Sequence, residues 1–186
     1  KKFESVIMGG WLSKAEGVVF DNWNFGEFNP DDLQISWGQD YGFSIDPSVL
    51  IGVAIDKKKK IIYVKEELYK TGMTTSQIAN VNTRVCGNGL IIGDSAEPRL
   101  IAELRNHGNK ILPTKKGAGS ISAGIALMQD YKIVVEENSQ NIAKELNNYV
   151  YADKGAKIFV DNWNHALDAI RYNVFFHLGG GGKSEF

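Results

Sequence analysis

The hydrophobic pattern of the chain changes its period near residues 71–73, and this change constrains the fold more than any other feature. Before it, segments 34–45, 49–55 and 61–69 have strand patterns and are joined by loops of a few residues. Loops this short join neighbouring antiparallel strands. After it, short apolar runs alternate with helical patterns, which is typical of parallel strands linked by helices. We therefore expect an α/β fold with a mixed sheet, three antiparallel strands followed by parallel strands, and helices on both faces.

The later elements can be placed by their caps and apolar runs. Thr74 or Thr75 is expected to cap the first helix, Ser95 the second and Asp161 the last. A ribonuclease-H-like fold has this order of elements, and its first strand lies centrally, beside the strand that follows the first helix. We expect helices over 75–85, 96–107, 118–129, 138–147 and 162–176, strands at 90–92, 110–113 and 131–135, and a hairpin across 149–160.

Length and charge limit the function. At 186 residues the chain is expected to form one domain. Its formal net charge of −1 gives no general attraction to polyanions, so nucleic acid would have to meet local basic patches. Cys86 is the only cysteine, which excludes an internal disulfide and indicates a buried residue in a reducing compartment. Apolar runs are far shorter than the ~20 residues of a membrane span, so no membrane partner is expected.

Three regions are expected along the chain. Residues 1–33 have the pattern of an irregular, aromatic-rich lead-in, 34–176 that of the folded domain, and 177–186 that of a flexible Gly-rich tail. Because the chain opens on Lys1 and not on Met, we expect it to be a fragment of a longer protein.

Asp40 has an unusual place in the first predicted strand. Strand alternation gives it glycine neighbours, Gly38 and Gly42, on its own face. Glycine inside a strand often marks the close approach of a ligand or another backbone, although a bulge or a satisfied edge aspartate gives the same pattern. The opposite face is bulky and is expected to enter the core; it carries Trp37, Gln39, Tyr41, Phe43 and Ile45.

Further polar side chains are expected to reach Asp40. Asp94 ends an apolar strand that lies beside the first strand in this fold, where ligands bind in open sheets, although it could instead cap a helix. Asp168 lies among apolar residues of the last helix and needs a partner or a metal. His165 shares the helix face of Asp168 and could assist proton transfer; otherwise it is a solvated histidine. Glu97 is more typical of a helix-dipole partner than of a ligand.

Three carboxylates would form an all-oxygen site, which suits Mg²⁺ or Mn²⁺. Two such ions ~3.5–4 Å apart can hydrolyse a phosphodiester, with Asp40 as the bridging ligand. Lys115 and Lys116 precede a Gly/Ser-rich helix start that suits a phosphate. Lys154 and Lys157 on the late hairpin form a further candidate DNA contact.

These segments together resemble the C-terminal nuclease domain of the large terminase subunit of tailed double-stranded-DNA bacteriophages, over roughly residues 9–176. A Bacillus siphophage is the source that the resemblance suggests. The ordered segments that carry it are Gly10-Trp11 with Glu16–Phe20, Gly38–Gly42, Ile92–Pro98 and Asn164–Tyr172.

The resemblance implies an endonuclease that cuts concatemeric viral DNA during headful genome packaging in the host cell cytoplasm. The implied partners are double-stranded DNA, the small terminase subunit, the capsid portal protein and an ATPase domain of the same polypeptide. Some members of the family carry a second acid where this chain has Leu167, so a fourth ligand such as Glu97 or water stays open. A Holliday-junction resolvase or transposase core has the same fold. A non-catalytic adaptor is a further alternative, although it has no need of three converging carboxylates.

Overall fold

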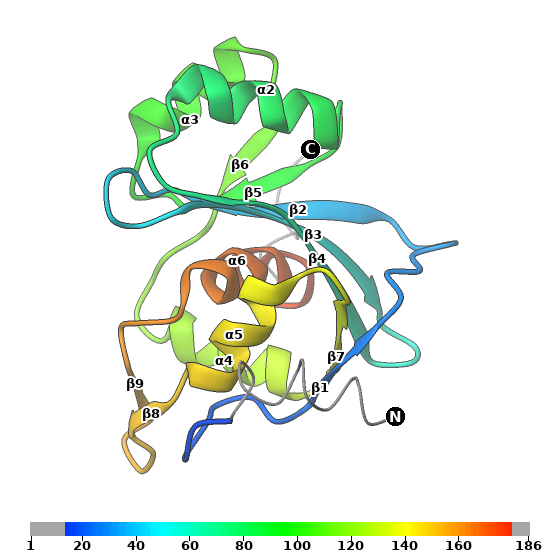
Figure 1. Ribbon diagram of the computed structural model, residues 1–186, viewed down its shortest axis with the longest axis vertical. Coiled ribbons are helices and arrows are strands. Elements are labelled where there is room, and N and C mark those ends of the chain that lie inside the picture. Colours follow the sequence, from blue (N-terminus) through cyan, green and yellow to red (C-terminus); the bar gives the residue numbers. More distant parts are fainter. Residues whose placement is uncertain (1–13, 180–186) are drawn as a thin grey trace.

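A computed structural model describes residues 14–179 of the chain. In this part of the chain a seven-stranded mixed sheet, in the order β1-β7-β4-β3-β2-β5-β6, lies between two layers of helices (Figure 1). The strands of the sheet are β1 (Trp23–Gly26), β2 (Ile35–Asp40), β3 (Ser48–Asp56), β4 (Ile61–Lys70), β5 (Ile91–Gly93), β6 (Ile111–Pro113) and β7 (Lys132–Glu136).

The strand directions confirm the predicted fold class. Strands β2, β3 and β4 form an antiparallel meander. The remaining pairs, β2 with β5, β5 with β6, β4 with β7 and β1 with β7, are parallel. The first strand of the meander lies beside the strand that follows the first helix after it, as predicted, so the ends of β2 and β5 meet at one edge.

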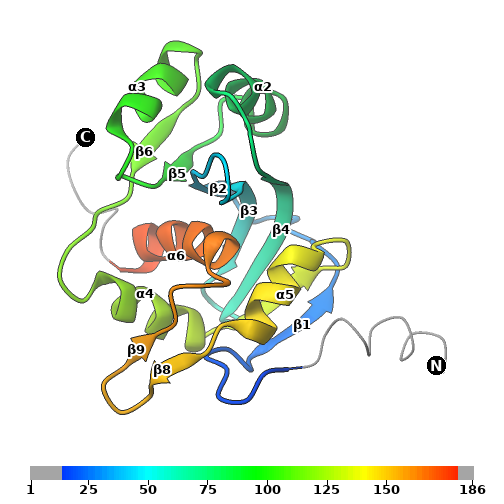
Figure 2. The same ribbon diagram turned by 60° about the vertical axis from the view of Figure 1, so that its left-hand side comes forward.

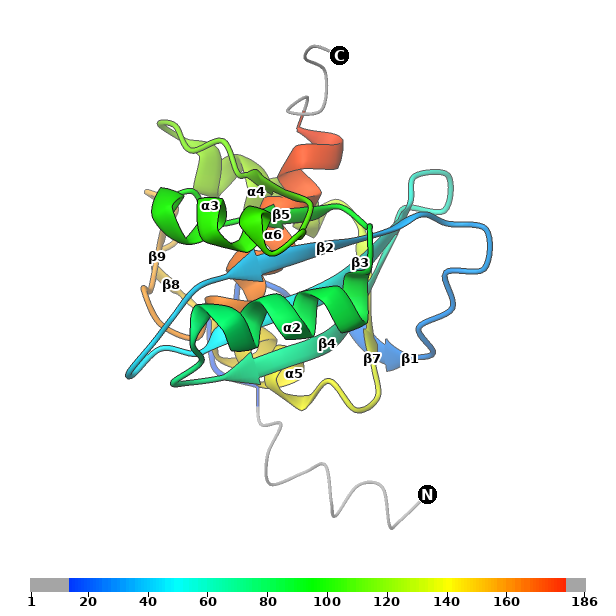
Figure 3. The same ribbon diagram turned by 90° about the horizontal axis from the view of Figure 1, so that it is seen from above.

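The helices lie in two layers, one on each face of the sheet (Figure 3). Each layer covers a separate apolar core. Helices α2 (Thr75–Cys86) and α3 (Pro98–Asn106) cover one face. Helices α4 (Ser120–Gln129), α5 (Gln140–Asn148) and α6 (His165–Leu178) cover the other, and α6 lies against β2 and β5. A two-stranded hairpin of β8 (Tyr151–Asp153) and β9 (Ile158–Phe159) extends from this second layer (Figure 2). None of the helices described is long and apolar enough to span a membrane.

The first strand of the meander is shorter than its alternating pattern predicts. It ends at Asp40, and the predicted residues 41–45 form a turn, so Phe43 and Ile45 are 65% and 86% exposed and do not enter the core. The turn is fixed by contacts within residues 42–48: the Ser48 hydroxyl donates to the Gly42 carbonyl (2.9 Å), and a Cβ on Gly42 would collide with the backbone that returns toward β3.

The lead-in is also more ordered than predicted. It contains β1, which pairs with β7 more than 100 residues later, with Trp23 opposite Ile133. The Trp23 and Phe25 rings pack against the core on the α4–α6 side. Residues 1–13, including Gly10-Trp11 of the resemblance, lie outside the described residues, as do 180–186 of the predicted tail.

The predicted caps are confirmed for one helix and wrong for two. Thr74 caps α2 in a reciprocal capping box with Gln77. Helix α3 has Glu97 at its N-cap in place of Ser95, since Pro98 begins the helix. Helix α6 has Asn164 in place of Asp161, and neither observed N-cap makes a side-chain cap bond.

Candidate active site

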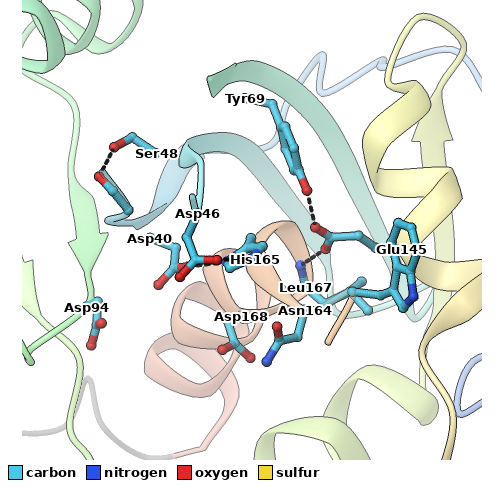
Figure 4. A network of polar contacts seen from close by, with 12 residues as sticks. Asp40, Asp46, Ser48, Tyr69, Asp94, Glu145, Asn164, His165, Leu167 and Asp168 are labelled. Carbon is cyan, nitrogen blue, oxygen red and sulfur yellow. Dashed lines mark hydrogen bonds and ion pairs between the residues drawn. The ribbon is translucent and has the colours of Figure 1, made fainter. Parts of the chain in front are cut away.

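Gly38 brings α6 to the centre of the sheet. A Cβ on this residue would collide with the Ala169 carbonyl oxygen of α6. Of the readings that the sequence left open, the close approach of another backbone is therefore the one observed. It places the first turn of α6, with His165 and Asp168, over the end of β2, where Asp40 lies (Figure 4).

Asp40 is a buried carboxylate with weak partners. It is 9% exposed, and Tyr172 Oη and His165 Nδ1 each lie 3.4 Å from one of its oxygens. These contacts are longer than a normal hydrogen bond to a carboxylate. Burial raises the pKa of Asp40, and the nearby Asp94 carboxylate raises it further, against the lowering effect of His165 and Lys116. The carboxylate is thus incompletely compensated.

Asp94 follows β5 at the same edge. Its backbone N–H donates to the Gln39 carbonyl (3.0 Å), which holds it beside the end of β2. One side-chain oxygen accepts the Ala96 N–H (3.1 Å), so the capping interpretation describes part of its role. The same oxygen forms an ion pair with Lys116, whose ammonium also lies 5.8 Å from the centre of the Tyr172 ring.

Asp168 has the partner that its apolar surroundings require. Arg171, one helical turn later and 7% exposed, donates to Asp168 Oδ1 over 3.1 Å. Burial raises the pKa of Asp168, and Arg171 lowers it. The Asp40 carboxylate raises it, as expected when two acids lie near each other. Leu167, which precedes Asp168 and is not an acid, is buried in the core.

The His165 side chain contacts the Asp40 carboxylate, although it shares a helix face with Asp168. Its ring lies between two carboxylates, with Nδ1 3.4 Å from Asp40 and Nε2 3.4 Å from Asp46. The hydrogen bond to Asp40 raises the pKa of His165. Sequence reasoning placed Asp46 in the loop after the first strand but missed it as a site residue, because residues 41–45 were predicted to continue the strand and to carry this loop away from Asp40.

The donor set fits a hard divalent cation in its chemistry. Asp40, Asp94 and Asp168 offer only oxygen ligands, and the buried charge of Asp40 is incompletely compensated. In residues 14–179, however, no three His, Cys, Asp or Glu side chains are grouped closely enough to hold one ion together. The cations Lys116 and Arg171 pair with two of the three acids. Binding therefore requires side-chain movement at this edge.

A groove of about 380 Å³ runs from Asp168 along the start of α4. Its wall includes Lys116, Ser120, Asp168 and Tyr172, and Lys115 lines the adjoining groove of about 390 Å³. The structure thus brings one of the two predicted basic pairs to the acidic edge. Lys154 and Lys157 are exposed around the β8–β9 turn, and they line neither groove as far as the structure describes them. Glu97 is exposed and lines a different cavity, beside α2 and α3.

Fold and acidic edge together define a ribonuclease-H-like domain with a candidate metal centre. Residues 40–175 match the family model described as "Terminase RNAseH like domain". The chain belongs to this family of terminase domains.

Two curated relatives are large terminase subunits. The chain is 32% identical to that of Bacillus phage SPP1 in an alignment 192 positions long, which covers 98% of this chain and 43% of that protein. It is 30% identical to the PBSX phage subunit from Bacillus subtilis in an alignment 141 positions long, which covers 73% of this chain and 33% of that protein. The chain therefore spans less than half the length of either relative, and both confirm the predicted resemblance to a Bacillus phage terminase.

Solved structures agree with this assignment. The SPP1 large terminase nuclease domain, solved with bound Mn, matches with a TM-score of 0.76 and 31% identity, over 86% of this chain and 98% of that one. The nuclease domain of the P22 large terminase matches with a TM-score of 0.69 at 18% identity, over 88% of this chain and 93% of that one, which supports the fold alone.

Proposed function

We propose that this domain is a divalent-metal-dependent endodeoxyribonuclease that cuts concatemeric viral DNA during headful genome packaging. The observation that supports the proposal is the position of Asp40 at one sheet edge, near enough to Asp94 and to Asp168 for the carboxylates to affect one another's pKa, with Lys116 paired to Asp94 there. The related SPP1 nuclease domain was solved with bound Mn, which favours Mg²⁺ or Mn²⁺ here. Two such ions, if bound, would supply Lewis-acid activation of a water molecule and charge stabilisation at the leaving oxygen.

The residues of the chain have distinct proposed roles. Asp40, Asp94 and Asp168 would hold the metal, with Asp40 central among the three acids. His165, held between Asp40 and Asp46, can orient a water molecule and take a proton at its ring nitrogen.

The proposed DNA contacts lie along the groove and on the hairpin. Lys115 and Lys116 would meet backbone phosphates beside the acids, and Lys154 and Lys157 would do so on the hairpin. Contacts of this kind carry no sequence information, so cutting should have little sequence preference.

The partners and regions are proposed from the family. Residues 1–33 would connect an ATPase domain of the same polypeptide to the nuclease domain, 34–176, with β1 completing the edge of its sheet. Double-stranded DNA, the small terminase subunit and the portal protein are the other partners, in the host cell cytoplasm.

The test is cleavage of supercoiled plasmid with Mn²⁺, with and without a chelator, over a series of salt concentrations. We expect nicking and linearisation that the chelator stops and that falls steeply with salt, because phosphate contacts release counterions. Lys116→Ala should weaken cleavage and reduce the salt slope, whereas Lys58→Ala, in the exposed β3–β4 turn, should not. An inactive domain would support the adaptor alternative, and a strong preference for a branched junction would support a resolvase.

A further inference from the structure

The first turn of α6 lacks the usual cap. The first N–H groups of any helix have no partner within the helix and are commonly satisfied by an N-cap side chain. Here the N-cap residue, Asn164, makes no such bond, and its amide donates to Asp161 instead (3.1 Å). Because this turn carries His165 and Asp168, whatever satisfies it also determines where the candidate catalytic groups lie.

The missing cap comes from another helix. Glu145 of α5 accepts the Leu167 N–H at Oε2 (2.9 Å) and a second backbone bond from Ala166. Its other oxygen, Oε1, accepts the Tyr69 hydroxyl of β4 (2.8 Å). The side chain is 1% exposed, so these donors take the place of water. One buried carboxylate thus joins α5, β4 and the start of α6 (Figure 4).

We propose that Glu145 is a positioning residue: it fixes the first turn of α6 so that His165 and Asp168 lie against Asp40. A negative charge at a helix N-terminus is favoured by the helix dipole, and all three observed partners of the carboxylate are donors. Glu145 does not touch the metal or the DNA in this role. The consequence for cleavage rests on the proposed function, whereas the positioning itself does not.

The charge of this cap should depend on pH. Burial raises the pKa of Glu145 to about 7. The backbone N–H groups of Leu167 and Ala166, the Tyr69 hydroxyl and the charge of His165 act in the opposite direction and lower it. The titratable groups that face it are Tyr69 from β4 and His165 from α6, and Lys144 precedes it on α5 with its ammonium over the Trp163 ring. The carboxylate is therefore ionised above about pH 7 and loses its charge below it.

The test compares Glu145→Gln with the parent by NMR and by Mn²⁺ binding. Glutamine keeps the shape and removes the charge, and Glu137→Gln, an exposed glutamate just before α5, is the matched control. We expect a fall of about tenfold in the exchange protection of the Leu167 amide, displaced His165 ring resonances, and Mn²⁺ affinity lowered about 10-fold or more, as for other residues that orient ligands. The protection of Leu167 should fall below pH 7 in the parent and be flat in Glu145→Gln.

Unchanged Leu167 protection, His165 resonances and Mn²⁺ affinity in Glu145→Gln would overturn the proposal, even if the melting temperature fell, because a purely structural residue would act on stability alone. If Glu145→Gln does not fold, Tyr69→Phe is the second variant, because it removes only the hydrogen bond to Oε1. It should cause smaller changes in the same three measurements, and no change in any of them would equally overturn the proposal. None of these measurements requires cleavage. A parent that cuts no DNA would therefore remove the proposed function and leave the positioning role to be judged on its own data.

Discussion

Gln39 and Asp40 are neighbours in strand β2, but their buried side chains lie on opposite faces of the sheet and are partnered in opposite ways. Toward α2, the amide of Gln39 exchanges two hydrogen bonds with Asn82 (2.8 and 3.0 Å), and Asn82 donates further to Asn109 (3.2 Å). Toward α6, the next residue, Asp40, makes two hydrogen bonds with side chains of residues 14–179, and both are long, at 3.4 Å. The first arrangement is neutral and satisfied, and the second is charged and incompletely satisfied.

This difference distinguishes a polar side chain buried to stabilise the fold from one buried at a binding site. Satisfied polar networks make a core specific, whereas an under-compensated charge costs stability and is kept where it can bind something. Burial raises the pKa of Asp40, Asp168 and Glu145, all on the α6 side. The side chains of Gln39, Asn82 and Asn109 do not titrate. The predictions that follow test whether the two faces are independent.

The largest effect is expected from Asp40→Asn. It should abolish cleavage, because the proposed central metal ligand is lost, and leave the metal-free domain as stable as the parent or more so, because a buried charge is removed. Mn²⁺ that binds only the folded state raises the melting temperature. Thermal melts with Mn²⁺ and with chelator should show a smaller Mn²⁺ shift for Asp40→Asn than for the parent or for Asp31→Asn, an exposed control. Equal shifts would mean that Asp40 is not at the metal.

His165→Ala should lower the cleavage rate by ~10²–10⁴-fold without unfolding the protein, since positioned proton transfer is typically worth that much. His107→Ala, at the exposed end of α3, is the control. Single-turnover cleavage with a circular dichroism check measures both properties. A rate within about twofold of the parent would make His165 a bystander.

The pH dependence of stability should come from the α6 side. Glu145 has a folded-state pKa of about 7 against an ordinary 4.5, so its protonated form is favoured by folding. The corresponding stability is complete below pH ~4.5 and is lost as the pH rises to about 7, a change of ~3 kcal/mol from this group. Urea denaturation from pH 5 to 8 should show this slope in the parent and lose most of it in Glu145→Gln. A slope that persists in the variant would assign it to other groups.

Sequence reasoning placed the elements and the acids because both follow from local pattern and topology. The ends of β2 and β5 had to meet once the strand order was known, and this placed Asp40 beside Asp94. It failed at the end of β2, where alternation continues to Ile45 but the Gly42 turn ends the strand. It also missed β1, a short strand whose partner lies more than 100 residues away.

The contacts that surround the acids could not be predicted either, because most of them join residues far apart in the sequence. Glu145 lies 22 residues from Leu167 and 76 from Tyr69, and nothing in its own segment shows that it faces a helix N-terminus. The pairing of Lys116 with Asp94 depends on where a loop crosses the sheet edge. Arg171 could have been found, since it is three residues from Asp168 on one helix face.

Gly38→Ala tests the contact between β2 and α6. The added methyl group would collide with the Ala169 carbonyl, so we expect a loss of ~2–3 kcal/mol in the free energy of unfolding and weaker cleavage as α6 is displaced. Gly117→Ala is the control, because a Cβ there meets nothing within 4 Å. Urea denaturation of both variants decides the matter. Equal stability would show that α6 can shift without cost.

Asn82→Ala tests the other face of the same strand. It leaves the Gln39 amide and Asn109 Oδ1 buried without their partner, which should cost ~2 kcal/mol. Asn80→Ala, an exposed asparagine on the same helix, has the same change in helix propensity and should cost nothing. The loss should be the same at pH 5.5 and pH 8, because this network carries no titrating group. Cleavage per folded molecule should stay within about twofold of the parent. If cleavage falls in proportion to stability, Gln39 transmits the disturbance along β2 to Asp40, and the two faces are not independent.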